Sequence, residues 1–214
     1  MALDLAHGKR AYDLLGRHPR LYRAVRFSVC FGRERRLQQL AVAATGLAPG
    51  ATVLDLACGT GVNHPHLHAL VGRTGRILAV DYSTGMLETA RAAVRIHGWT
   101  NIDFLQADAA CLDLPAASLD AALCTFGLSA MPGERAALQR VATALKPGAP
   151  FVALDAKAFT GWASVFNPIA GPVFQYTTNW DYRKDVVASI RATFPHVQLV
   201  EFNAGCNFLA VAHR

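Results

Sequence analysis

The stretch VLDLACGTG at residues 53–61 decides the fold of this 214-residue chain. An apolar run delivers Asp55 and then leads through a turn with Gly59 and Gly61 into a helical pattern. Glycines in such a turn let the backbone approach a ligand closely, and the helix that follows offers free N–H groups. In open α/β sheets the ligand lies beyond the carboxyl ends of the strands. The stretch therefore predicts a strand, a ligand-binding turn and a helix, with a nucleoside as the expected ligand.

Strand-like and helix-like segments alternate from this stretch to the end of the chain. We expect strands at residues 51–57, 75–80, 101–106, 119–124, 151–155, 197–202 and from near 206 to 212, with helices at 61–71, 83–97, 134–145 and 182–194. This alternation requires right-handed crossovers between parallel strands, with helices covering both faces of the sheet. The predicted fold class is therefore α/β, with a doubly wound and mostly parallel sheet of seven strands.

Two further carboxylates follow the second and third expected strands. Asp81 ends the second strand, 20 residues after Gly61, where a carboxylate can accept both hydroxyl hydrogens of a ribose. Asp108 ends the third strand, where it can hold an exocyclic amine. The turn lacks the third glycine of a dinucleotide-binding motif, because His64 stands in that position. Together with Asp55, these residues place three carboxylates at three successive strand ends.

The motifs in this order resemble those of the class I S-adenosylmethionine-dependent methyltransferases, and the resemblance covers most of the chain from about Ala51. It is carried by VLDLACGTG (53–61), ILAVDYSTGMLETA (77–90), FLQADA (104–109), LDAALCTFGLSAMP (119–132) and LKPGAPFVALD (145–155). The resemblance implies the Rossmann-like methyltransferase fold, with S-adenosyl-L-methionine as the cofactor.

The resemblance also implies how individual residues hold the cofactor. Gly59 and Gly61 would lie against its methionine end, and Asp81 would hold the ribose hydroxyls. Met86 would line the adenine, while Asp108 with Ala109 would fix the adenine edge. Phe126 would lie near the methionine amine, and Ala57 stands where a glycine is common in the family. The complete predicted cofactor-binding set, with no metal site, is Asp55, Ala57, Gly59, Gly61, Asp81, Tyr82, Met86, Asp108, Ala109 and Phe126.

The expected chemistry needs few catalytic groups. Methyl transfer from a sulfonium is an in-line displacement, so the protein must mainly align the acceptor and exclude water. An amine acceptor needs little acid–base help, whereas a phenol needs a base near its own pKa. His64 is the candidate general base because it lies nearest the expected cofactor, and Tyr12 is the second candidate catalytic residue. No Asn-Pro-Pro-Tyr run follows the fourth strand, which argues against methylation of nucleic-acid bases or of protein glutamine.

The start of the chain is strongly basic. Residues 1–40 carry nine Lys and Arg against three Asp and Glu, which accounts for the whole formal charge of +6. We expect residues 1–48 to form a helical lid of the same domain, with residues 49–214 binding the cofactor. The Tyr-Asp start is similar to ubiquinone/menaquinone C-methyltransferases, and the run 26–33 is similar to betaine-lipid and phospholipid N-methyltransferases. Basic residues beside apolar ones suit contact with an anionic membrane through residues 1–40; a solvated helical face is the alternative.

A long connection at residues 158–181 suggests where an acceptor binds. It carries two prolines and the aromatic residues Trp162, Phe166, Phe174, Tyr176 and Trp180, which would supply an apolar wall. We therefore expect N-methylation of a hydrophobic or lipid-like small molecule. The alternatives are C- or O-methylation of a quinone or phenolic metabolite, and a sensor or cyclase that binds the cofactor without transferring its methyl. An RNA methyltransferase is disfavoured, because no appended basic module is present.

Composition points to the cytoplasm. No apolar run reaches the roughly 18 residues that a membrane span needs, and the N-terminus lacks the pattern of a secretory leader. The five cysteines are scattered and have no metal-ligand spacing, which indicates reduced thiols. We expect a cytoplasmic protein, with peripheral membrane contact as a further expectation; the sequence does not indicate an oligomeric state.

Overall fold

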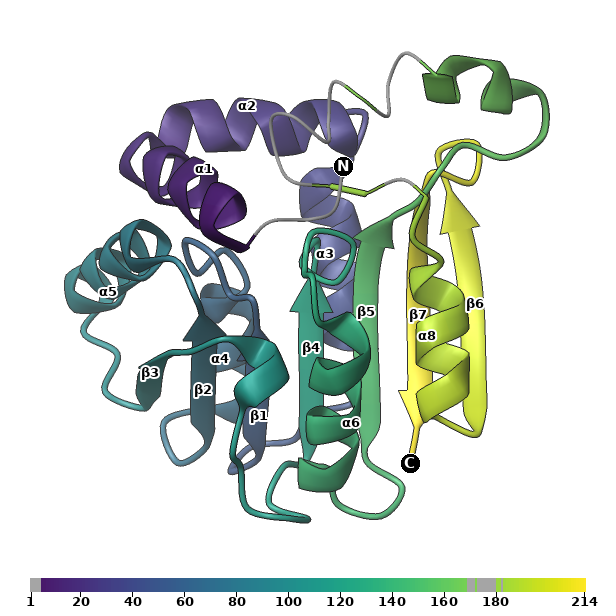
Figure 1. The fold of residues 1–214 in the computed structure, drawn as a ribbon. Helices are drawn as coiled ribbons and strands as arrows, with labels where there is room; N and C mark the ends of the chain where they lie inside the picture. The colour runs from purple at the N-terminus through teal and green to yellow at the C-terminus, as the bar shows by residue number, and fades with distance from the viewer. Residues whose placement is uncertain (1–4, 169–171, 173–179, 182) are drawn as a thin grey trace.

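The computed structural model describes residues 5–168, 172, 180, 181 and 183–214, and it contains a seven-stranded sheet with helices on both faces (Figure 1). The strands are β1 (Thr52–Leu56), β2 (Arg76–Asp81), β3 (Ile102–Gln106), β4 (Ala121–Thr125), β5 (Pro150–Ala156), β6 (His196–Phe202) and β7 (Asn207–His213). Their order across the sheet is β3-β2-β1-β4-β5-β7-β6. Strands β1 to β5 pair in parallel, and β7 is antiparallel to both β5 and β6. The expected doubly wound, mostly parallel fold is confirmed.

Helices cover both faces because adjacent strand residues point to opposite sides of the sheet. The helices are α1 (Leu5–Arg17), α2 (Pro19–Val29), α3 (Glu34–Ala43), α4 (His64–Val71), α5 (Thr84–His97), α6 (Glu134–Ala144) and α8 (Val186–Thr193), with short 3-10 turns η1 (Ala109–Cys111) and η2 (Gly161–Phe166). Val53 packs in the core under α3, α4 and α5, whereas Leu54 packs under α6 and α8. None of the described helices is long and apolar enough to cross a membrane.

Only part of the N-terminal segment covers the strand ends. Helices α1 and α2 lie above the carboxyl ends of the parallel strands, while α3 packs against the sheet and belongs to its core (Figure 1). A Cβ atom built on Gly16 of α1 would lie 2.5 Å from the carbonyl carbon of Gly85 in α5, so the two backbones touch. Asp13 Oδ1 accepts hydrogen bonds from the Ser83 hydroxyl at 2.7 Å and from the Gly85 N–H at 3.1 Å. These contacts hold the lid, α1 and α2, on the β2 side of the sheet.

Two helices begin later than expected. The helix expected at residues 61–71 starts at His64, because Gly61 at the expected start adopts φ +78°, outside helical geometry. The helix expected at residues 182–194 starts at Val186, after an aspartate N-cap. In both cases the local cap or turn chemistry overrides the apolar periodicity on which the expected starts were based.

Candidate functional site

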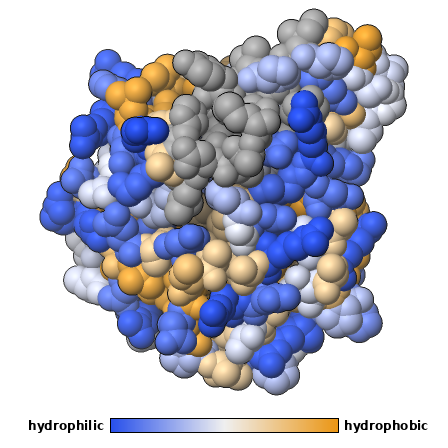
Figure 2. All heavy atoms as spheres, viewed as in Figure 1, coloured by the Kyte–Doolittle hydropathy of each residue, from blue (hydrophilic) through white to orange (hydrophobic). Residues whose placement is uncertain are grey.

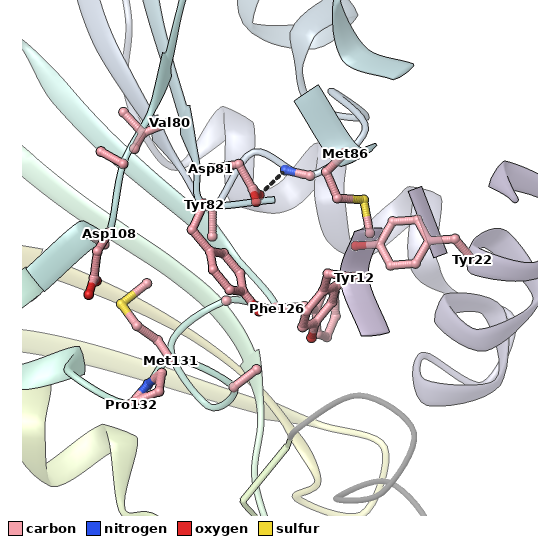
Figure 3. Close-up of a pocket in the computed structure, with 16 residues that line it drawn as sticks. Tyr12, Tyr22, Val80, Asp81, Tyr82, Met86, Asp108, Phe126, Met131 and Pro132 are labelled. Atoms are coloured by element: carbon pink, nitrogen blue, oxygen red, sulfur yellow. Dashed lines mark hydrogen bonds between the residues drawn. The ribbon is translucent and has the colours of Figure 1, made fainter. Parts of the chain in front are cut away.

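A cavity of about 610 Å³, counted to its open mouth, lies at the carboxyl ends of the strands beneath the lid (Figure 3). The strand order reverses there, between β1 and β4, and doubly wound sheets bind their ligands at such a point. We call this cavity the strand-end pocket. It is lined by Tyr12, Tyr22, Ala57, Gly59, Val80, Asp81, Tyr82, Met86, Ala107, Asp108, Ala109, Phe126, Gly127, Ala130, Met131 and Pro132.

The strand-end pocket brings together most of the residues predicted to bind the cofactor. Those in its wall are Ala57, Gly59, Asp81, Tyr82, Met86, Asp108, Ala109 and Phe126, together with the candidate catalytic residue Tyr12. Asp55, Gly61 and His64 do not line it. The charged side chains in its described lining, Asp81 and Asp108, are both acidic, which suits a ligand with a sulfonium and an ammonium group.

Asp81 lies at the carboxyl end of β2, and its carboxylate faces the strand-end pocket (Figure 3). Its Oδ2 accepts the Gly59 N–H at 2.8 Å, and its Oδ1 accepts the Ser83 N–H at 2.9 Å. Burial raises the pKa of Asp81 to about 6, while these two backbone donors act to lower it. Each carboxylate oxygen has two lone pairs, so the ionised group can still accept the hydroxyls of a ribose. The geometry fits the predicted role.

The backbone turn between β1 and α4 forms a narrow part of the pocket wall. Ala57 adopts φ +53°, a left-handed conformation that is strained for a residue with a Cβ atom. Its methyl group faces Gly127 in the loop after β4, where a built Cβ would lie only 2.6 Å away. The alanine at this family glycine position therefore fits because the facing residue is itself a glycine. A Cβ built on Gly59 would lie 3.4 Å from the Tyr22 hydroxyl, which brings the lid directly over the turn.

Asp55 supports the turn from below. The Asn63 amide donates hydrogen bonds to Asp55 Oδ1 and to the Thr125 hydroxyl, both at 3.0 Å, and all three side chains are buried. Gly61 is needed for space, because a built Cβ would lie 2.5 Å from His64 Nδ1. We predicted Asp55 and Gly61 as cofactor contacts, but the structure places them behind the pocket wall. They position the residues that do line it.

His64 is not placed to act as a general base. Its ring is 1% exposed and packs edge-on against Phe104, with ring centres 5.7 Å apart. Its Nε2 lies 3.4 Å from Asp55 Oδ2, beyond normal hydrogen-bond length. A general base must reach the proton that it removes, directly or through one water, and this ring is sealed beneath the turn. The expectation failed because helix α4 starts at His64 and turns its side chain inward.

The end of β3 supplies the far wall of the strand-end pocket. Asp108 Oδ1 accepts the Ala110 N–H at 3.0 Å and caps η1, which leaves the other carboxylate oxygen available at the pocket. Met86, at the start of α5, is almost fully buried in the same wall. Tyr82 stands edge-on to Tyr12, with ring centres 6.2 Å apart. These residues form the slot in which an adenine would lie between apolar side chains and a carboxylate.

Two phenols of the lid close the pocket. Tyr12 from α1 and Tyr22 from α2 both line it (Figure 3). Burial raises the pKa of both tyrosines above the ordinary value of a phenol. Each phenol is therefore neutral at neutral pH, and it can donate a hydrogen bond but is a poor base. Tyr12 is thus a candidate hydrogen-bond donor or positioning group.

A second cavity of about 780 Å³, counted to its open mouth, adjoins the first. We call it the lid pocket. It shares Tyr12, Tyr22, Phe126 and Ala130 with the strand-end pocket. The rest of its lining is Val25, Arg26, Ser28, Val29, Cys30, Phe31, Ser129, Ala156, Lys157, Phe159, Trp180, Cys206 and Asn207. This described lining is largely apolar and includes no carboxylate.

The aromatic connection at residues 158–181 contributes partly as expected. Phe159 and Trp180 line the lid pocket, whereas Trp162 and Phe166 belong to η2 and do not. Phe174 and Tyr176 lie outside the described residues.

Arg26 is a buried charged group in the lining of the lid pocket that the sequence did not single out. Its side chain is buried, and its Nε lies 2.7 Å from Glu34 Oε1. The guanidinium carbon lies 5.5 Å from the centre of the Tyr22 ring and 5.4 Å from that of Phe126. Its Nη2 is buried without a hydrogen-bond partner among the described residues. An unpaired buried donor costs about 1–3 kcal/mol, so this group is ready to bind an oxygen of a ligand.

The loop after β4 was recognised only in part. The motif LDAALCTFGLSAMP identified Phe126, but Gly127, Ala130, Met131 and Pro132 of the same motif also line the strand-end pocket. Asp155 at the end of β5 holds this loop, because its Oδ1 accepts the Ser129 hydroxyl at 2.5 Å and its Oδ2 accepts the Ser129 N–H at 3.1 Å. Burial raises the pKa of Asp155. The loop thus supplies Phe126 and Ala130 to the wall that the two pockets share.

Comparison with known proteins finds a family match for the central part of the chain. Residues 53–148 match a family model described as a methyltransferase domain. The ubiquinone/menaquinone biosynthesis C-methyltransferase UbiE of Hahella chejuensis is 33% identical over 125 residues, which cover 58% of this chain and 50% of that protein. The chain spans about half to three-fifths of the length of such curated relatives, 50% and 59% in two of them.

Solved structures share the fold. A SAM-dependent methyltransferase from Aquifex aeolicus matches with a TM-score of 0.64 and 21% identity, covering 82% of this chain and 88% of that one. The cyclase SpnF matches with a TM-score of 0.63 and 23% identity, covering 78% of this chain and 58% of that one. At these identities the likeness establishes the shared fold and not a shared reaction.

Proposed function

Residues 53–148 form a class I S-adenosylmethionine-dependent methyltransferase domain, and from this premise we propose that the protein methylates an apolar small molecule bound in the lid pocket. One observation carries the proposal: the two pockets share a wall of four residues, Tyr12, Tyr22, Phe126 and Ala130. In-line displacement requires the acceptor atom to approach the methyl group within contact distance. Two adjoining cavities beneath one lid meet that requirement.

Each pocket has its own task. Asp81 would hold the ribose and Asp108 the adenine in the strand-end pocket, and S-adenosylmethionine would supply an electron-poor methyl group when bound there. Phe126 and the two lid phenols close the junction between the pockets, which keeps water away from the reacting atoms. The lid is pinned to α5, so the junction is preorganised.

Arg26 favours an acceptor that carries an acidic or carbonyl oxygen. A guanidinium with a free, buried N–H stabilises a phenolate, an enolate or a carbonyl, and the described lining of the lid pocket offers no carboxylate for an ammonium. We expected a nitrogen acceptor from the sequence. The pocket instead supports the alternative, C- or O-methylation of a quinone-like or phenolic molecule, and the named relatives are C-methyltransferases. With His64 buried elsewhere, Arg26 would favour the deprotonated acceptor in place of a dedicated base.

The direct test is product formation across matched acceptors. The protein is incubated with S-adenosylmethionine and with ring compounds of similar size that carry either a hydroxyl or an amine, and S-adenosylhomocysteine is measured. We expect turnover with the hydroxyl series. Arg26→Met combined with Glu34→Gln removes both charges of the ion pair together. This double variant should lower kcat/KM by about 10- to 100-fold, the value of one hydrogen bond to a charged group. Cofactor affinity should change little.

A matched control and two outcomes keep this proposal falsifiable. Arg140→Met removes an exposed arginine from α6, outside the lid, and should leave kcat/KM unchanged. If the protein methylates only the amines, and the Arg26 variant does not change that rate, the original expectation of N-methylation would be supported instead. Cofactor binding without S-adenosylhomocysteine from any acceptor would indicate a sensor or a cyclase.

A further inference from the structure

Exposed apolar side chains from two distant parts of the chain gather at one edge of the molecule. Phe27 and Phe31 come from α2 and its end, and Trp162, Val165 and Phe166 come from η2; all five are at least half exposed. We call these five residues the apolar rim. Phe31, Trp162 and Phe166 line one shallow surface hollow, so the two segments meet there. Scattered exposed apolar residues are normal on a protein surface, but a contiguous group usually marks an interaction site.

The apolar rim lies at the mouth of the lid pocket. Phe31 and Phe159 line both the surface hollow and the lid pocket, and their rings meet edge-on with centres 6.3 Å apart. An apolar molecule leaving a hydrophobic phase at the rim would therefore enter the lid pocket past these two rings.

The rim is bordered by positive charge. Residues 17–36 contain seven arginines and a single acidic residue, Glu34. Glu34 pairs with Arg26, whose own side chain lines the lid pocket, and the other six arginines are exposed: Arg17, Arg20, Arg23, Arg33, Arg35 and Arg36. Figure 2 shows one group of hydrophobic atoms in orange at the upper left, over the lid, and another at the upper right, over η2, each beside hydrophilic atoms in blue. Aromatic side chains beside exposed arginines are the pattern of a surface that lies on anionic lipid.

We propose that the apolar rim and the exposed arginines of residues 17–36 dock the protein on an anionic lipid bilayer, from which the acceptor enters the lid pocket. Charge complementarity selects the partner: the arginines face anionic headgroups, and the aromatic rings reach the acyl boundary between them. Entry of the acceptor rests on the proposed function, whereas docking itself does not.

Vesicle sedimentation of the whole chain, without cofactor or acceptor, tests the docking. We expect binding to phosphatidylcholine vesicles that contain phosphatidylglycerol and little binding to phosphatidylcholine alone, with salt weakening the interaction. Arg20→Gln with Arg23→Gln should weaken binding about thirtyfold, at about 1 kcal/mol for each charge. The matched control, Arg95→Gln with Arg140→Gln, removes two exposed arginines from α5 and α6 and should have no such effect.

An apolar pair of variants makes the test sharper. Trp162 is 80% exposed in the rim and Ile96 is 81% exposed on α5, so Trp162→Ser and Ile96→Ser are matched in exposure. Only Trp162→Ser should lower vesicle affinity, by at least about tenfold, since a buried aromatic ring contributes more than 1.4 kcal/mol. Equal effects of both variants, or no binding to anionic vesicles, would overturn the proposal. If the protein does not bind vesicles but binds single-stranded RNA, and Trp162→Ser keeps that RNA binding, the arginines would be assigned to nucleic acid instead.

Discussion

Replacing Asp81 by asparagine should abolish most of the affinity for S-adenosylmethionine. Both carboxylate oxygens already accept backbone N–H groups, from Gly59 at 2.8 Å and from Ser83 at 2.9 Å. An amide would turn an NH₂ group toward one of these donors, and it could no longer accept two ribose hydroxyls as an anion. Two hydrogen bonds to a charged group are worth at least about 3 kcal/mol, which corresponds to about 150-fold weaker binding.

Isothermal titration calorimetry with S-adenosylmethionine and with S-adenosylhomocysteine measures this loss directly. Asp103→Asn is the matched control, because Asp103 is an exposed carboxylate at the neighbouring strand β3 that pairs with Arg76 on the surface. A thermal melt of each variant separates loss of the site from loss of the fold. If Asp81→Asn keeps a native melt and binds the cofactor within threefold of the unchanged protein, our assignment of the strand-end pocket is refuted.

Three further predictions follow from the same geometry. Burial raises the pKa of Asp81 to about 6, and the ribose hydroxyls bind better to its ionised form. The affinity for S-adenosylmethionine should therefore be full above that pKa and fall as the pH drops through it, to about tenfold weaker at about pH 5 than at about pH 8. A calorimetric affinity that does not change with pH would contradict this prediction. Ala57→Gly should stabilise the protein by about 0.5–1 kcal/mol in urea unfolding, since it relieves a left-handed alanine, and a loss of stability would show that φ +53° is not strained. His64→Ala should cost about 2 kcal/mol of unfolding free energy, because it leaves a cavity where the buried ring packs against Phe104, yet it should change kcat by less than about threefold. A large fall in kcat with an unchanged melt would show that His64 takes part in the chemistry.

The fold and the cofactor end of the site could be predicted because their causes are local. Two neighbouring residues such as Val53 and Leu54 pack on opposite faces of the sheet, so a buried parallel strand reads as a continuous apolar run. The carboxyl ends of parallel strands meet along one edge, which is why Asp81 and Asp108 could be placed in one pocket from spacing alone. The expected helix starts were wrong where a turn or an N-cap set the boundary.

The acceptor side depended on contacts between segments far apart in the chain. The sequence around Arg26 is basic and is typical of a solvent-exposed helix face. Its guanidinium is buried between Tyr22 and Phe126 because α2 docks over the loop after β4. The position of His64 after the glycine turn predicts an active-site residue. Its side chain is buried outside the pocket because the first turn of α4 points it inward. The sequence by itself thus determined the sheet, the glycine turn and the strand-end carboxylates, because each depends on periodicity or backbone geometry within a few residues. The tertiary structure alone decided the lid pocket and its buried charge, because burial is a property of what packs against a residue from elsewhere in the chain.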